Sequence, residues 1–87
     1  VDPNNSTFLD TYAWVLFKSG NYSLARFYIR SAIENEKNPS SVLYEHYGDI
    51  LFMNDEKEEA VKMWRKAFEL ENGESDNLKY KIENGLR

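Results

Sequence analysis

The chain has 87 residues and no cysteine, so it fits one small domain and cannot form disulfides or cysteine-ligated metal sites. Its 15 acidic and 11 basic residues give a formal net charge of −4, and the basic residues are scattered, which argues against nucleic acid as a partner. The chain is 41% hydrophobic, but charged residues interrupt it throughout, so we expect a folded protein with no direct membrane insertion.

The first half of the chain contains two stretches with the apolar spacing of amphipathic helices, which predict helices over residues 7–18 and 22–35. Thr7 and Asp10 have the spacing of a capping box, and Asn21 is a candidate N-cap for the second helix. The apolar positions of the two helices are Leu9, Tyr12, Ala13 and Leu16, then Ala25, Tyr28, Ile29 and Ala32.

The second half repeats this arrangement and predicts helices over residues 41–53 and 56–71. Ser40 is a candidate N-cap, and Asp55 with Glu58 has the spacing of a second capping box. Gly48 lies inside the third helix, where glycine is tolerated if a neighbouring helix comes too close for a side chain. The apolar positions here are Tyr44, Tyr47, Gly48 and Leu51, then Ala60, Met63, Trp64 and Ala67.

A fifth, half-polar helix is predicted over residues 75–84. Leu78 and Ile82 lie one helical turn apart, and most of the remaining residues of this segment are polar. We therefore expect a helix that buries only one narrow face.

The two halves align when the sequence is shifted by 35 residues. Large residues then match large ones and small residues match small ones, as a recurring packing unit requires. The aligned pairs are Leu9 with Tyr44, Tyr12 with Tyr47, Ala13 with Gly48, Leu16 with Leu51, Phe17 with Phe52, Ala25 with Ala60, Ile29 with Trp64 and Ala32 with Ala67. The fold class is therefore predicted to be all-α, with one two-helix unit present twice.

This pattern resembles the tetratricopeptide repeat, a helix–turn–helix unit usually 34 residues long. The second repeat matches the family signature through Tyr44, Tyr47, Gly48, Leu51, Ala60, Trp64 and Ala67, and the first repeat matches it less regularly. The first repeat also lacks the family's proline five residues after its last signature alanine, because Lys37 stands there and Pro39 follows two residues later.

The resemblance implies a right-handed α-α superhelix. It divides the chain into the tail of a preceding repeat (1–5), repeat 1 (6–40), repeat 2 (41–74) and a capping helix (75–87). It also implies the C-terminal end of a longer array. The style of the sequence is similar to that of bacterial members, and because no targeting signal is visible, cytoplasm and periplasm both remain open.

In this family the first helix of each repeat lines a concave surface that often binds peptides or partner helices, so the resemblance implies a noncatalytic protein–protein interaction scaffold. On that surface the chain carries acidic and aromatic residues, which suit a basic partner with an apolar or aromatic anchor. An acidic C-terminal tail, as bound by some family members, would be repelled. The candidate partner-binding residues are Asp10, Trp14, Phe17, Lys18, Glu45, His46, Asp49 and Phe52.

Alternatives remain beside this hypothesis. Trp14 could pack inward between the repeats, and Phe17 and Phe52 could belong to the core instead of the binding surface. The chain could also be a purely structural end of an array that binds its partner elsewhere. Glu45, His46 and Asp49 lie close in sequence, but with no second histidine and no cysteine they do not predict a metal site or catalysis, and no cofactor is expected. Weak self-association is expected through the apolar edge of the first helix.

Overall fold

The computed structural model describes residues 6–86, with side chains from Phe8 onward, and this part of the chain is helical without strands. The helices are α1 (Ser6–Lys18), α2 (Tyr22–Glu34), α3 (Ser41–Met53), α4 (Lys57–Leu70) and α5 (Asp76–Asn84). Their bounds differ from the predicted ones by no more than one residue at any end. The predicted all-α class is therefore confirmed for the described residues.

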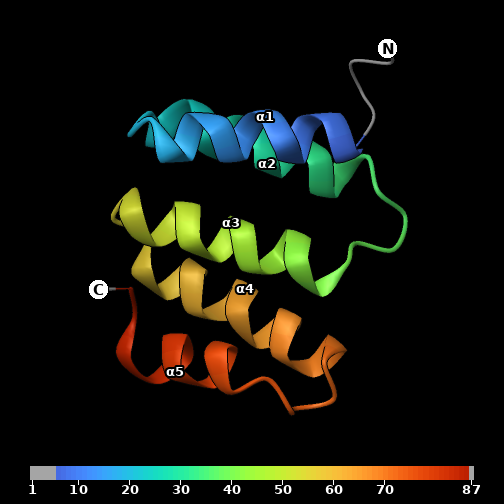
Figure 1. The fold of residues 1–87 in the computed structure, drawn as a ribbon, viewed down its shortest axis with the longest axis vertical. Coiled ribbons are helices and arrows are strands. Elements are labelled where there is room, and N and C mark those ends of the chain that lie inside the picture. Colours follow the sequence, from blue (N-terminus) through green and yellow to red (C-terminus); the bar gives the residue numbers. More distant parts are fainter. Residues whose placement is uncertain (1–5, 87) are drawn as a thin grey trace.

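The helices form two antiparallel hairpins, α1–α2 and α3–α4, followed by α5 (Figure 1). Within each hairpin the two helices pack along their length, and α2 packs on α3 while α4 packs on α5. Each helix in the middle of the stack therefore has packed neighbours on two sides. The arrangement brings α3 between the first hairpin and α5.

Only some of the helices have a side-chain hydrogen bond that caps their N-terminus. The Oγ atoms of Ser40 and Ser75 accept hydrogen bonds from the backbone N–H groups of Leu43 and Leu78, which satisfies one free donor at each helix start. Asn21 stands at the predicted N-cap of α2, but its side chain makes no capping bond.

The second predicted capping box is wrong, and the first lies outside the described side chains. Asp55 adopts a positive φ of 63°, and Glu56 occupies the N-cap position of α4. The Asp55 side chain therefore sits in the turn before the helix rather than at its cap. The box of Thr7 with Asp10 involves the side chain of Thr7, which is not among the described ones.

The core consists of two buried clusters, and the residues predicted from the repeat pattern account for most of both. The first cluster joins α1, α2 and α3, and the second joins α3, α4 and α5. Removing this apolar surface from water is the main favourable term in the stability of such a helical stack. The buried residues are Leu9, Ala13, Ala25, Ile29, Ala32, Leu43 and Ile50 in the first cluster, and Leu51, Ala60, Trp64, Ala67 and Leu78 in the second.

Gly48 provides the closest approach within the second hairpin. A Cβ atom at this position would lie 2.4 Å from both Cδ1 and Nε1 of Trp64, whose side chain is fully buried. The indole of α4 therefore rests directly on the backbone of α3. The prediction that Gly48 marks a close helix crossing is confirmed, and the contacting group is a large aromatic ring.

An ion pair joins the first hairpin to the turn between α3 and α4. The guanidinium group of Arg26 on α2 donates through Nε and Nη2 to the two carboxylate oxygens of Glu56, before α4. The hydrogen bond to Glu56 is the largest influence on the pKa of Arg26, which is raised. Such a two-pronged ion pair fixes orientation as well as distance, so it aligns the first hairpin with the second.

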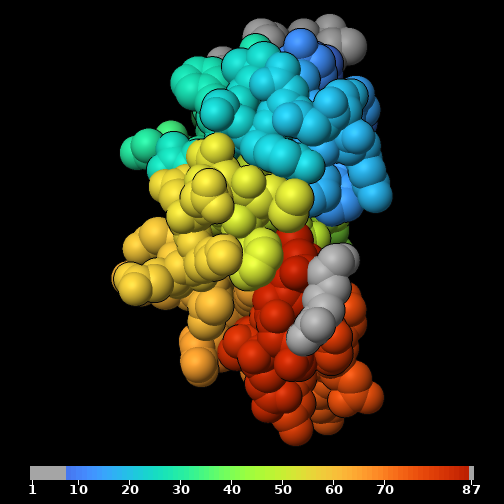
Figure 2. All heavy atoms as spheres, turned by 90° about the vertical axis from the view of Figure 1, so that its left-hand side faces the viewer, coloured from blue at the N-terminus to red at the C-terminus, as the bar shows by residue number. Residues whose placement is uncertain are grey.

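The residues that follow α5 run back along the stack toward the end of α3 (Figure 1). Figure 2 shows the end of α5 lying beside the end of α3, where the turn to α4 begins. Leu86 packs against the second core cluster, and a Cβ atom at Gly85 would lie 2.7 Å from the ring of Phe52. Phe52 of α3 therefore contacts both Trp64 of α4 and the residues that follow α5.

Candidate interaction surface

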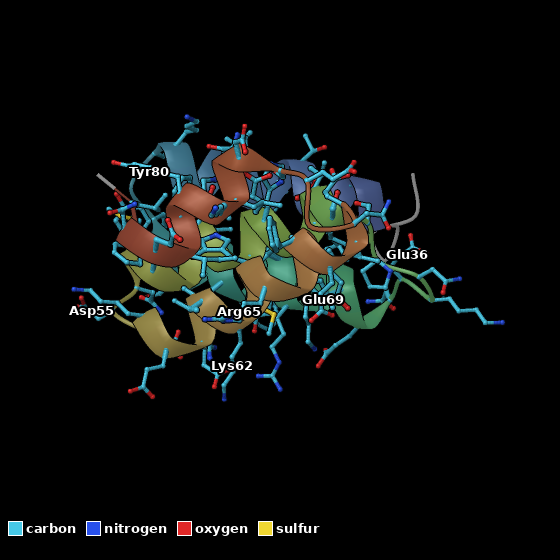
Figure 3. The ribbon with its side chains drawn as sticks, turned by 90° about the horizontal axis from the view of Figure 1, so that it is seen from below. Glu36, Asp55, Lys62, Arg65, Glu69 and Tyr80 are labelled. Carbon is cyan, nitrogen blue, oxygen red and sulfur yellow. The ribbon has the colours of Figure 1, made fainter. Side chains whose placement is uncertain are left out.

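The residues predicted for partner binding lie on α1 and α3, and α5 adds further residues on the same side of the stack. Viewed along the stack, α1 and α5 lie toward one side and α2 and α4 toward the other (Figure 3). Tyr80 of α5 and Lys62 of α4 accordingly lie on opposite sides. We call the side formed by α1, α3 and α5 the interaction face.

The first group of predicted residues forms a stacked cluster around Trp14. The rings of Trp14 and His46 are nearly parallel, with centroids 4.0 Å apart, and Phe17 stacks on Trp14 with centroids 4.8 Å apart. The Nζ atom of Lys18 lies 5.4 Å from the centroid of the Trp14 ring. A hydrogen bond of 2.8 Å from His46 Nδ1 to Asp10 Oδ1 fixes the imidazole. We call these five residues the Trp14 cluster.

The Trp14 cluster joins the two hairpins, because Asp10, Trp14, Phe17 and Lys18 come from α1 and His46 comes from α3. Trp14 is half-buried, and the rings of Phe17 and His46 both stack on its indole. This position lies between the two alternatives left open by the sequence. The indole contributes to packing between α1 and α3 and still reaches the surface.

The second group surrounds Lys81 of α5. Lys81 Nζ lies 2.6 Å from an oxygen of Glu45 and 3.0 Å from Oδ1 of Asp49, and its side chain is only 14% exposed. Trp64 Nε1 donates to the same Asp49 oxygen over 3.0 Å, and Asn77 Nδ2 donates to Glu45 over 2.9 Å. We call these five residues the Lys81 cluster. It ties α5 to α3 through Lys81 and Asn77, and the hydrogen bond from Trp64 to Asp49 joins α4 to the same cluster.

Two groups of the Lys81 cluster, the Asp49 carboxyl and the Lys81 amine, have raised pKa values. Burial raises the pKa of the Asp49 carboxyl, although the charge of Lys81 and the hydrogen bonds from Lys81 and Trp64 act against this rise. Burial also acts to lower the pKa of Lys81, but hydrogen bonds and charge interactions with Glu45 and Asp49 together outweigh it and raise the pKa. Lys81 therefore keeps its positive charge in the folded protein.

The structure corrects the prediction for Asp49. This residue was placed among the solvent-facing groove residues, but it is only 6% exposed and lies beneath Lys81. Phe52 is half-buried against the second core cluster, in line with the core-packing alternative, and the Nζ atom of Lys57 lies 5.4 Å from its ring centroid. The reason is α5, which covers this part of α3.

Lys81 and Asn77 belong to this face but are not among the residues predicted for it. They lie four positions apart on the predicted fifth helix, so they share one side of it. This i, i+4 pairing was the available signal, but its meaning depends on which helix α5 contacts. Lys81 adds a second lysine to Lys18 beside the three predicted carboxylates, those of Asp10, Glu45 and Asp49, so this group is less acidic than predicted.

The raised pKa values of Tyr47 and Lys81 predict a loss of stability in alkali. Tyr47 and Lys81 both have a raised pKa, the former through burial, relative to ordinary values of 10.0 and 10.5. Because the folded state holds these protons more tightly, their stabilisation is complete below about pH 10 and is lost as pH rises through the folded pKa values. Urea unfolding between about pH 9 and about pH 11 should therefore show a falling free energy of unfolding. The decline should be smaller in Tyr47→Phe and in Lys81→Met than in the parent chain. If both variants lost as much stability as the parent chain over this pH range, the assignment would be contradicted.

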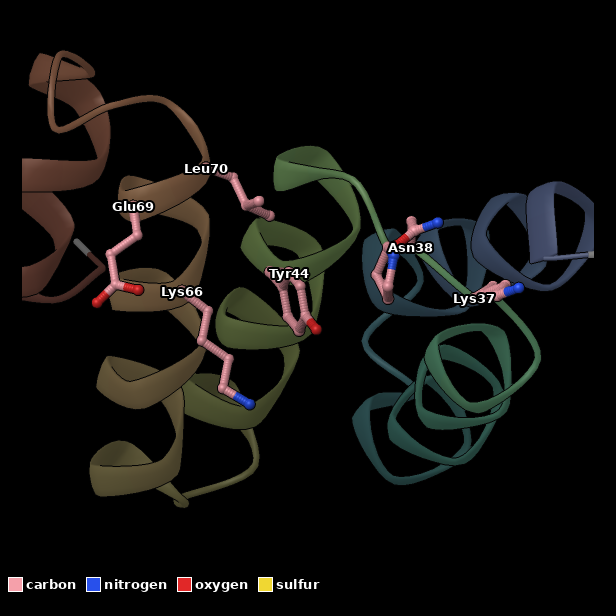
Figure 4. A pocket seen from close by; sticks show the side chains of 7 residues that line it. Lys37, Asn38, Tyr44, Lys66, Glu69 and Leu70 are labelled. Carbon is pink, nitrogen blue, oxygen red and sulfur yellow. The ribbon is translucent and has the colours of Figure 1, made fainter.

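A separate hollow lies between α4 and the loop that joins α2 to α3 (Figure 4). Its lining combines two lysines with one glutamate, and Lys66 Nζ lies 5.6 Å from the ring centroid of Tyr44. The hollow shares no residue with the Trp14 or Lys81 cluster. The lining residues are Lys37, Asn38, Pro39, Tyr44, Lys66, Glu69 and Leu70.

Within residues 6–86, no three histidine or acidic side chains are grouped closely enough to hold a metal ion. In the same part of the chain, no helix has the length and apolar character needed to cross a membrane.

The comparisons with known proteins found no matching protein-family model, no matching curated protein and no matching solved structure.

Proposed function

We propose that the chain is a noncatalytic interaction module built from tetratricopeptide-like hairpins, and that its interaction face binds a peptide or a helix of another protein. The repeated apolar pattern, the two antiparallel hairpins and the fit of Gly48 against Trp64 support the family assignment. The half-buried Trp14 cluster supports the position of the binding site.

The observation that carries the proposal is the stacked arrangement of Trp14. Its ring is held in place by His46 and Phe17, so a partner can contact it without ordering a mobile side chain first. Aromatic residues fixed in this way are common hot spots of protein interfaces. The cluster therefore suits a partner that inserts an apolar or aromatic side chain beside the indole.

The charges near the cluster favour a basic segment over an acidic one. Asp10 is 21% exposed as a side chain and Glu45 is 23% exposed, so both carboxylates remain within reach of a partner beside their internal contacts. Lys81 and Lys18 reduce this preference without reversing it. We expect moderate selectivity for a peptide that carries arginine or lysine next to an aromatic residue.

The second candidate function is purely structural. The Lys81 cluster favours it, because Glu45 and Asp49 already hold α5 against α3 and α4. In that case the face closes the end of a helical stack, and partner binding occurs elsewhere in a longer protein. The two hypotheses predict different results for a binding measurement on Trp14.

The test is calorimetric titration of the chain with two synthetic peptides, one basic and aromatic and one acidic. The binding hypothesis predicts tighter binding of the basic peptide and a loss of affinity of about tenfold or more in Trp14→Ala. Leu70→Ala is the control, because Leu70 is 52% exposed on α4 and lies outside the interaction face. Preference for the acidic peptide, or equal loss in both variants, would contradict the proposal, and absence of binding would favour the structural alternative.

A further inference from the structure

The first hairpin carries an exposed apolar surface at the end of the stack. Tyr12, Val15, Leu24 and Phe27 are 41%, 56%, 39% and 60% exposed. The ring of Tyr28 joins the two helices, since its centroid lies 4.7 Å from that of Tyr12 and 5.3 Å from that of Phe27. We call these five residues the end face. Tyr12, Tyr28 and Phe27 are in ring contact across α1 and α2, and Val15 and Leu24 add exposed apolar surface on the same two helices.

The α1 part of the end face corresponds to buried positions in the second hairpin. A shift of 35 residues places Val15 on Ile50 and Tyr12 on Tyr47. Ile50 is fully buried in the first core cluster, where it meets residues of α2, and Tyr47 packs against the same cluster. The equivalent surface of α3 is therefore a site where another helix packs.

The α2 part of the end face is apolar although the hairpin itself does not require it. The same shift places Leu24 on Glu59 and Phe27 on Lys62. On α4, Lys62 Nζ and Glu59 Oε1 form an exposed ion pair at 3.2 Å. Because charged residues serve at these positions in the second hairpin, the apolar residues of the first point to a contact outside it.

The distribution of charge in the molecule indicates what covers the end face. The molecule has a net charge of −4, but none of the five end-face residues is charged, and Arg30 and Glu34 on α2 pair with each other at 3.3 Å. Two copies that meet through this face avoid the repulsion between their acidic residues. The end face has no charged residue that would attract a partner of opposite charge.

We propose that the end face binds a second copy of this chain in a two-fold symmetric dimer. In such an isologous contact, the same surface of both copies meets itself. Residues of α1 and α2 from one copy then pack on those of the other, and Tyr12 and Phe27 become buried. The dimer leaves the interaction face of each copy on a different side of the hairpin.

Sedimentation equilibrium of the chain over a wide concentration range tests this proposal. We expect a reversible monomer–dimer equilibrium, and a dissociation constant raised about tenfold or more in the double variant Val15→Lys, Phe27→Lys. Phe27→Lys reproduces the residue type found at Lys62 on α4, so circular dichroism should show an unchanged helical fold. Leu70→Lys is the matched control, since Leu70 is comparably exposed on another helix and should leave the dissociation constant unchanged.

Three results would overturn the proposal. The first is a chain that sediments as a monomer at every concentration, which would leave a different protein as the occupant of the end face. The second is a dimer that the double lysine variant does not weaken, which would place the contact elsewhere. The third is an equal effect of Leu70→Lys, which would show that added positive charge and not loss of the end face disrupts the dimer.

Discussion

Lys81→Met is expected to lower the free energy of unfolding by about 2–4 kcal/mol, because it removes the positive partner of two carboxylates at once. Asp49 is 6% exposed and cannot recover its hydration where it lies, so its negative charge would be left with Trp64 as its remaining donor. Methionine retains most of the volume of the lysine stem, which limits the loss of packing. Urea unfolding at neutral pH measures the effect.

Two comparisons separate this charge effect from a general disturbance of α5. Lys79→Met changes an exposed lysine of the same helix and should alter stability by less than about 0.5 kcal/mol. Adding Asp49→Asn to Lys81→Met should restore part of the lost stability, since it removes the uncompensated charge. If the double variant were as unstable as the sum of the single ones, the pairing of Lys81 with Asp49 would be wrong.

The single variant Lys81→Met should recover stability in mild acid. Without Lys81, the pKa of Asp49 rises further above its ordinary value of 3.8, because burial then acts with less opposition. A folded state that holds a proton more tightly than the unfolded one gains stability as pH falls through the folded pKa. The difference between Lys81→Met and the parent chain should therefore narrow toward about pH 4.

Gly48→Ala is expected to destabilise the chain by about 1–3 kcal/mol, although alanine is the better helix former. The added methyl group would meet the Trp64 ring at 2.4 Å, and this ring is fully buried and hydrogen-bonded to Asp49. The helices α3 and α4 must then move apart. Thermal unfolding followed by circular dichroism would show the loss as a lower midpoint temperature.

The first hairpin supplies a matched compensating variant. Ala13 and Ile29 occupy the positions that correspond to Gly48 and Trp64, and both are fully buried. Gly48→Ala should therefore cause a much smaller loss of stability in a chain that carries Trp64→Ile than in the parent chain. A double-mutant cycle isolates this coupling from the hydrogen bond that Trp64→Ile removes in any background. Simple additivity would show that the two residues do not share one packing site.

Local patterns in the sequence were sufficient to predict the helices and most of the core. Apolar spacing identifies the face that each helix buries, and the position of Gly48 inside a helix implies a close crossing, although not the residue that makes it. These features depend on residues within one hairpin. Their physical basis, helical periodicity and the match of large with small side chains, can be read without knowing how hairpins are placed.

The polar contacts could not be predicted in the same way. Asp49 follows Gly48 on α3, and whether it faces water depends on where α5 lies, which helical periodicity does not determine. The same applies to Lys81, whose partners are 32 and 36 positions away. Asp55 was misassigned because a positive φ places it in the turn, and spacing alone does not reveal that conformation.

The most direct test of the proposed function is an NMR titration of the isotopically labelled chain with the basic aromatic peptide. We expect the amide and indole signals of Trp14, His46 and their neighbours on α1 and α3 to shift together as the peptide is added, with smaller shifts on the adjoining part of α5. Shifts confined to α2 and α4, or to the end face, would contradict the account.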